Sequence, residues 1–151
     1  SRQALDDVRH MLGVLRGEAE GPLVPEASLD ALGAIVASAS AMGVRVDLDD
    51  GLHPRPATAI QSAIVRTVRE ALTNAARHAP GTTVRVALAR EGGAATATIV
   101  DDGPAGAAPA TPGAGTGILG MRERAALLGG ALEAGPSGRG FRVVATFPEA
   151  S

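Results

Sequence analysis

The spacing of hydrophobic residues along the chain predicts helices alternating with strands. Apolar residues at helical spacing cover 2–16, 28–42, 57–79 and 118–128. Strand-like runs cover 44–48, 83–90, 94–101, 131–133 and 140–147. This order predicts an α/β fold, a two-layer α/β sandwich with a mixed sheet on one side and helices on the other.

Glycine and proline mark the boundaries between these elements. Residues 18–27 read as a linker, and Ser28 is a good N-cap for the helix that follows it. The segment 91–93, Glu-Gly-Gly, predicts a hairpin turn. Residues 103–117 hold five glycines and three prolines, so we expect a long glycine-rich loop there.

Composition excludes several classes of chemistry. The 151 residues carry a net charge of −2 and contain neither cysteine nor lysine. Disulfides, zinc–thiolate sites, lysine Schiff bases and a P-loop lysine are therefore excluded. Because the sequence has no basic block or stripe, we do not expect nucleic acid to be a partner. Because no run has the length of a membrane span and no signal peptide is visible, we expect these 151 residues to be cytoplasmic, whether or not the full-length protein has a membrane anchor.

The helix predicted over 57–79 carries the first candidate site. Glu70, Asn74 and His78 are four residues apart and share one face, with Arg77 beside them. A carboxylate, an amide oxygen, an imidazole and a guanidinium together suit the binding of a metal and phosphate oxygens beside a general base. The alternative is that these side chains form the solvated face of an amphipathic helix.

The second candidate is Asp101-Asp102-Gly103, at the end of a strand. A buried carboxylate there can accept a hydrogen bond from an exocyclic amine such as that of adenine. Gly103 would let the ligand approach the backbone closely. The alternative is a common Asp-Asp-Gly turn.

The third candidate is the glycine-rich segment 113–120, followed by Met-Arg-Glu-Arg at 121–124. Glycines that open a helix present free N–H groups and the positive end of the helix dipole, which suit phosphate. The alternative is a flexible linker. The segment is neither a P-loop nor a Rossmann fingerprint.

In this order and spacing, the three motifs resemble the N, G1 and G2 boxes of the GHKL ATPases, the superfamily of histidine kinases and gyrase-type topoisomerases. Residues 69–79, Arg-Glu-Ala-Leu-Thr-Asn-Ala-Ala-Arg-His-Ala, and 117–130, Gly-Ile-Leu-Gly-Met-Arg-Glu-Arg-Ala-Ala-Leu-Leu-Gly-Gly, are similar to sensor histidine kinases paired with LuxR/NarL-type response regulators. The resemblance implies a Bergerat fold with a long glycine-rich ATP lid. It also implies that 1–17 ends a second dimerisation helix and that 28–151 is the ATP-binding catalytic domain.

The resemblance also implies roles for single residues. Asn74 would coordinate the Mg²⁺ that bridges the phosphates of ATP, and Glu70 would polarise or deprotonate the attacking group. Asp101 would hold the adenine amine, with room provided by Gly103. The remaining residues would lie around the phosphates: Gly115, Gly117 and Gly120 in the lid, and Arg77 and His78 near the triphosphate.

The chain departs from the family pattern at several positions. Ala105 stands where a second glycine is expected, and Phe141 stands where many members have a threonine. Nothing matches the phosphoacceptor histidine, since His10 and His53 have the wrong neighbours. Because the chain starts abruptly at Ser1, we expect a fragment that binds ATP and lacks its own acceptor.

Three functions follow as hypotheses. The first is a histidine kinase domain that donates the γ-phosphoryl group to a histidine on a missing dimerisation helix, for relay to a response regulator. We expect this fragment to be mostly monomeric and the full-length kinase to be a homodimer. The second is a GHKL serine kinase of the anti-sigma-factor type. The third is a nucleotide-binding regulatory module without catalysis.

Overall fold

The structure, a computed structural model, describes residues 28–79, 81–103 and 115–149. The helical elements are η2 (Leu29–Ala31), α2 (Leu32–Ala41), α3 (Thr58–His78) and α4 (Gly115–Leu127). The strands are β1 (Arg45–Asp50), β2 (Thr83–Glu91), β3 (Ala94–Asp101), β4 (Ala131–Ser137) and β5 (Gly140–Pro148). None of these helices has both the length and the apolar character needed to cross a membrane. The helix predicted over 2–16 and the linker 18–27 lie outside the described residues.

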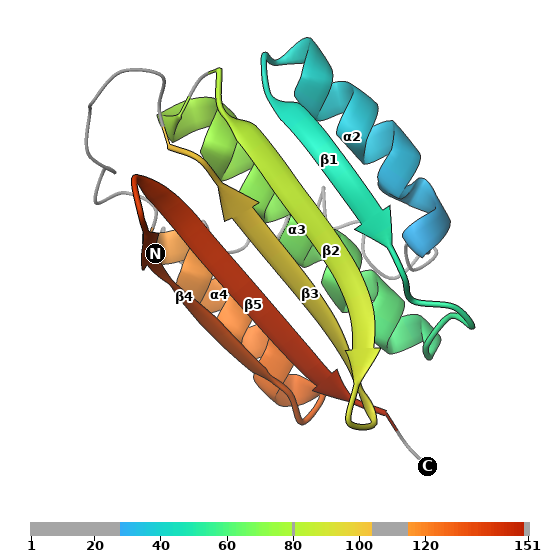
Figure 1. Cartoon of the computed structure of the whole chain (residues 1–151). Helices are drawn as coiled ribbons and strands as arrows, with labels where there is room; N and C mark the ends of the chain where they lie inside the picture. Colours follow the sequence, from blue (N-terminus) through green and yellow to red (C-terminus); the bar gives the residue numbers. More distant parts are fainter. Residues whose placement is uncertain (1–27, 80, 104–114, 150–151) are drawn as a thin grey trace, which may run out of the picture.

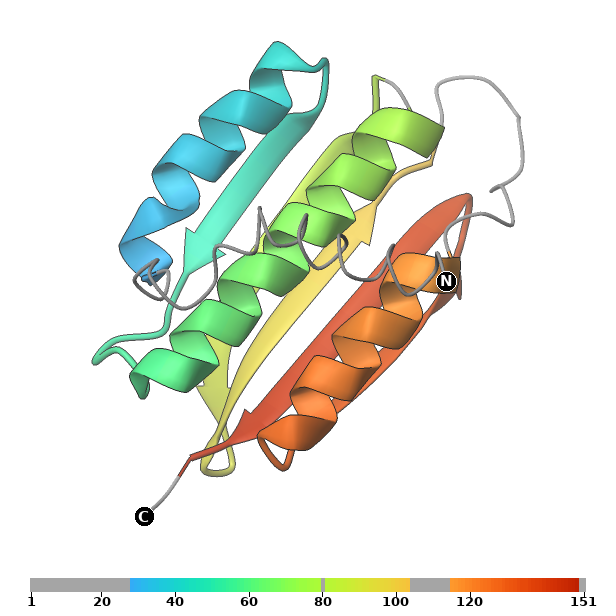
Figure 2. The same cartoon turned by 180° about the vertical axis from the view of Figure 1, so that it is seen from behind.

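The five strands form one mixed sheet in the order β1-β2-β3-β5-β4. β1 pairs with β2 in parallel, and the other neighbouring pairs are antiparallel. Helices α2, α3 and α4 all lie on the same face of this sheet, as the two opposite views show (Figures 1 and 2). The predicted two-layer sandwich with a mixed sheet and helices on one face is therefore confirmed.

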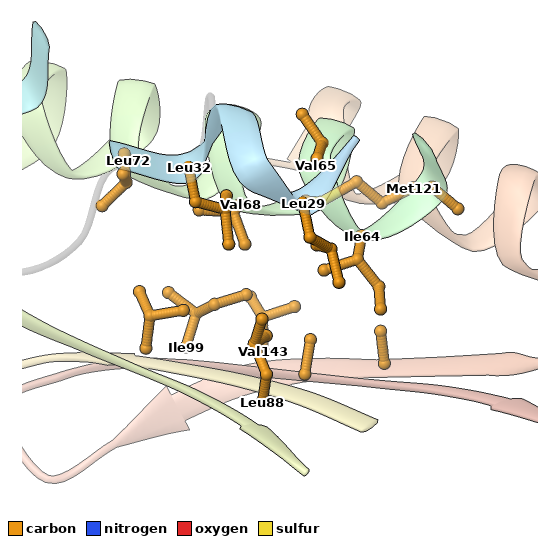
Figure 3. Close-up of a cluster of buried hydrophobic side chains, with 14 of the residues drawn as sticks. Leu29, Leu32, Ile64, Val65, Val68, Leu72, Leu88, Ile99, Met121 and Val143 are labelled. Atoms are coloured by element: carbon orange, nitrogen blue, oxygen red, sulfur yellow. The ribbon is translucent and has the colours of Figure 1, made fainter. Parts of the chain in front are cut away.

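The hydrophobic core fills the space between the helices and the sheet (Figure 3). On the helix side it contains Ile64, Val68 and Leu72, three residues of α3 that are at most 2% exposed. On the sheet side it contains alternate residues of the strands, such as Leu88 and Ile99. The spacing of four along α3 and of two along each strand thus directs one apolar face of each layer inward. The packing fixes α3 against the middle of the sheet.

Two boundaries differ from the sequence predictions by three residues or more, and the others differ by at most two. The closing strand β4 runs to Ser137 instead of ending at Glu133. The longer strand includes Pro136, which has no N–H group, and such a residue is tolerated because β4 lies at the edge of the sheet.

Helix α4 also begins earlier than predicted, at Gly115 instead of Ile118. Residues 115–117 of the loop predicted over 103–117 therefore belong to the helix. Residues 104–114 of that loop lie outside the described ranges. Met121 is buried and Ile118 is half-buried against the core, so their packing holds the first turn in place. Tertiary contact here outweighs the low helix propensity of glycine.

Candidate functional site

The carboxylate of Asp101 is held at the end of β3 by two backbone groups. The Gly103 N–H donates a hydrogen bond to Asp101 Oδ1 at 2.8 Å, and the Phe141 N–H donates a second bond to the same carboxylate. Burial raises the pKa of Asp101 above its ordinary value, while the two N–H groups act against the rise and the charge of Asp102 adds slightly to it. A half-buried carboxylate has more acceptor sites than these two bonds use. It can therefore accept a further hydrogen bond from a ligand.

Two glycines make this arrangement sterically possible. Gly103 has φ +88°, and a Cβ there would lie 2.1 Å from the carbonyl oxygen of Arg139. A Cβ on Gly140 would lie 1.9 Å from the Asp101 carbonyl oxygen and 2.6 Å from Asp101 Oδ1. The turn between β4 and β5 thus closes directly on the end of β3. Any side chain at either glycine would push these strands apart.

Beside Asp101 the structure has an open hollow between the helices and the sheet, with about 690 Å³ of space that includes adjoining solvent. Its polar lining residues are Asn74, His78, Asp101 and Arg139. Its walls are apolar or small: Ala71, Ala75, Ala79, Val84, Gly103, Ile99, Ile118, Met121, Gly140, Phe141 and Val143. Apolar walls with a few placed polar groups are typical of small-molecule sites. A flat heteroaromatic ring with an exocyclic amine suits these walls and the Asp101 carboxylate.

A comparison with protein families agrees with this geometry. The family model described as histidine kinase-, DNA gyrase B- and HSP90-like ATPase matches residues 59–151, more than half of the chain. The chain belongs to this ATPase family. The matched range contains all the residues that line the hollow, so the hollow is part of the family's shared domain.

Individual relatives are histidine kinases. The chain is 32% identical over 155 residues to the sensor histidine kinase LnrJ of Bacillus subtilis (strain 168), and the alignment covers 97% of this chain. The chain spans only 36% of the length of that relative. The resemblance to the GHKL ATPases is thereby confirmed at the level of the domain.

Solved structures share the fold. The histidine kinase domain of the Erythrobacter litoralis EL346 blue-light activated histidine kinase has a TM-score of 0.60 at 22% identity, covering 80% of this chain and 60% of that one. The Acinetobacter baumannii histidine kinase AdeS has a TM-score of 0.63 at 12% identity, covering 97% of this chain and 77% of that one. At these identities the likeness concerns the fold.

Within this ATPase domain, α3 supplies the polar wall of the hollow. Asn74 and His78 both line the hollow, as their spacing of four residues allows. Glu70 lies one turn earlier, is half-buried and is not among the lining residues. Arg77 is exposed and also lies outside the lining. The four polar residues that the sequence groups on one face are therefore divided between the hollow and its surroundings.

The glycine-rich segment reaches the hollow through α4. Gly115 and Gly117 lie in the first turn of this helix, where backbone N–H groups have no partner within the helix. Gly120 is half-buried in the next turn, beside Met121, which lines the hollow. The positive end of the helix dipole thus lies next to the lining residue Ile118, a favourable place for phosphate oxygens.

The residues present suit a magnesium ion that arrives with a nucleotide. Among the described residues, no group of three His, Cys, Asp or Glu side chains could hold a metal alone. Mg²⁺ usually keeps several waters and binds phosphates with only one or two protein ligands. The amide oxygen of Asn74, in the wall of the hollow, is of the right chemical type for such a ligand.

The sequence motifs assigned no role in the site to Arg139, Gly140 or Phe141, although Phe141 was noted as a departure from the family pattern. They reach Asp101 only because β5 pairs with β3 in the register that places Phe141 opposite Asp101. One signal was available in Gly138-Arg139-Gly140. Gly138, at φ +58°, serves the hairpin turn, whereas the turn does not account for Gly140. A second glycine that the turn conformation does not require indicates that another backbone approaches closely at that position.

Proposed function

We propose that this chain is the ATP-binding catalytic domain of a sensor histidine kinase. It binds Mg-ATP and donates the γ-phosphoryl group to a histidine on a dimerisation helix of the full-length protein. The phosphoryl group then passes to a response regulator of the LuxR/NarL type. The observation that carries the proposal is the Asp101 carboxylate, held by two backbone N–H groups beside an apolar hollow whose opposite wall carries Asn74.

In this proposal, different parts of the hollow bind the adenine base, the phosphates and the Mg²⁺ of Mg-ATP. Asp101 accepts a hydrogen bond from the adenine amine and so orients the base between the apolar walls. The first turn of α4, with Gly115 and Gly117, binds phosphate oxygens through its free N–H groups. Asn74 holds the Mg²⁺, whose charge neutralises the phosphate oxygens when the nucleotide is bound.

Phosphoryl transfer depends mainly on position and charge. A nitrogen of the acceptor imidazole attacks the γ-phosphorus, the bond from that phosphorus to the β–γ bridging oxygen breaks, and ADP leaves. Glu70, one turn from Asn74, polarises the attacking imidazole or accepts its proton.

The first experiment is a titration of the 151-residue protein with a fluorescent ADP analogue, with and without Mg²⁺. We expect saturable binding that ATP displaces and that Mg²⁺ strengthens. Asn74→Ala should abolish the strengthening by Mg²⁺ because the side-chain ligand is lost. Asp101→Asn should weaken binding at least tenfold, and its matched control is Asp102→Asn. Asp102 is exposed and pairs with Arg85 at 3.2 Å, so this variant should bind like the wild type. Absence of binding at millimolar nucleotide would refute the proposed site.

The second experiment identifies the acceptor. The protein is mixed with labelled ATP and a separate dimerisation domain from its full-length kinase, with and without the acceptor histidine. We expect acid-labile label only on the domain that has the histidine. Acid-stable label on a serine of a partner would favour a serine kinase of the anti-sigma-factor type. Binding without transfer would favour a regulatory module.

A further inference from the structure

Arg124 in α4 is a half-buried cation that the proposed function does not use. Its Nε atom is buried and has no hydrogen-bond acceptor among the described residues. Arg124 also forms no salt bridge with any other residue that the structure describes. A buried donor without an acceptor is unfavourable. The residue therefore has unused binding capacity.

The charges around Arg124 do not compensate its own. Burial lowers the pKa of the Arg124 guanidinium, and the nearby Arg66 lowers it further, while Glu70 and Glu123 act against the change. Since arginine keeps its proton in proteins, the lowered pKa means that the cation is held in an unfavourable environment. An anion placed beside it would relieve this.

The position of Arg124 puts it next to the proposed phosphate region. Helices α3 and α4 lie side by side and run in opposite directions (Figure 2). Met121 of α4 and Asn74 of α3 both line the hollow. Arg124 lies one turn after Met121 on α4, and Glu70 lies one turn before Asn74 on α3. Because the two helices are antiparallel, Arg124 and Glu70 are near each other. The side chain of Arg124 points back along its helix, so that its Nη1 lies 3.5 Å from the Cβ position of Gly120. The guanidinium thus lies between Glu70 and the glycine-rich start of α4.

We infer that Arg124 is a phosphate-binding residue whose guanidinium contacts the terminal phosphate of a nucleoside triphosphate in the hollow. This inference rests on the proposed function, because it assumes that the hollow binds a nucleotide with its base at Asp101. With the base there, the phosphates extend past Asn74 toward Glu70, where Arg124 can donate a forked pair of hydrogen bonds to phosphate oxygens. The other arginine of the segment, Arg122, has a structural contact instead, since its Nε donates to the Leu132 carbonyl oxygen at 3.3 Å.

The test compares two nucleotides that differ by the terminal phosphate. ADP and a non-hydrolysable ATP analogue are titrated by calorimetry, with Mg²⁺, into the wild type and Arg124→Gln. We expect Arg124→Gln to weaken the ATP analogue about tenfold and to leave ADP within about twofold, since one charge-assisted contact is lost. Arg124→Lys keeps the charge but loses the forked geometry, so its loss should be intermediate. The matched control is Arg69→Gln, which removes an exposed cation of α3 and should change neither affinity.

The outcomes separate this inference from the proposed function. If the wild type binds neither nucleotide, the proposed function fails. If it binds both, and the ratio of the two affinities is the same in Arg124→Gln, only the inference on Arg124 is overturned. An equal loss for ADP and the analogue also overturns it, because the contact would then not be to the terminal phosphate. We also expect Arg124→Gln without nucleotide to melt at or above the temperature of the wild type. That result would support the inference, because it would show that the fold alone does not need the Arg124 cation.

Discussion

The closest approach in the site lies between Gly140 of β5 and Asp101 of β3, and it makes Gly140→Ala a sharp test of the structure. An added Cβ would lie 1.9 Å from the Asp101 carbonyl oxygen, whereas real Cβ atoms essentially never come within 3.0 Å of such an atom. The two strands must therefore separate locally by about 1 Å, which is 3.0 minus 1.9 Å. Both neighbours in this contact are backbone or short side chain, so neither can rotate away.

The effect should appear in both stability and binding. Overpacking of this kind costs about 1–3 kcal/mol of unfolding free energy, which corresponds to a decrease in melting temperature of roughly 3–10 °C at this chain length. The same movement displaces Asp101 Oδ1, 2.6 Å from the added Cβ, and disturbs its 2.8 Å hydrogen bond from the Gly103 N–H. With the acceptor displaced, nucleotide affinity should fall at least tenfold, about 1.4 kcal/mol.

The assay is thermal unfolding combined with nucleotide titration, and Gly135→Ala is its matched control. Gly135 lies in the partner strand β4, and a Cβ there would meet nothing within 4 Å. We expect this control to stay within about 0.5 kcal/mol of the wild type and to bind nucleotide normally. If Gly140→Ala melted and bound nucleotide like the control, the close pairing of Gly140 with Asp101 would be refuted.

Other predictions concern the Asp101 carboxylate and the core. Because burial raises the pKa of Asp101 in the fold, the folded state holds that proton more tightly than the unfolded chain does, and ionisation opposes folding. As pH falls through the raised pKa, the wild type should therefore gain stability relative to Asp101→Asn, while it loses nucleotide affinity because the acceptor becomes protonated. Melting and titration over an acidic pH series check both directions, and parallel changes of stability and affinity would contradict the reasoning. In the core, Leu72→Ala, at a side chain 2% exposed, should cost about 2–5 kcal/mol in urea unfolding. Leu127→Ala, at a side chain 84% exposed, should cost less than about 0.5 kcal/mol, and equal losses would contradict the assignment of the core.

Local patterns were sufficient for much of the fold. The helix predicted over 57–79 is α3 (Thr58–His78), and the hairpin predicted around 91–93 joins β2 to β3. Both depend on contacts between residues close in sequence, namely helical periodicity and the turn preference of glycine. The predictions were less accurate for β4 and the start of α4, where burial by distant residues outweighs local preference.

The candidate site divides in the same way. Asn74 and His78 lie together because a helix brings residues four apart onto one face, and Asp101 and Gly103 adjoin because they are neighbours in the chain. The resemblance to the ATPase family required only the order and spacing of such short motifs. These parts of the site can be read from the residues alone, since their geometry is local.

Only the tertiary structure joined these pieces to Arg139, Gly140 and Phe141 and placed Arg124 beside Glu70. The first contact depends on the register between β3 and β5, and the second on how α4 packs against α3. Register and packing are set by the burial of the whole core, with its many weak contacts between residues far apart in the chain. A pattern of neighbouring residues does not encode which distant partner each of them meets.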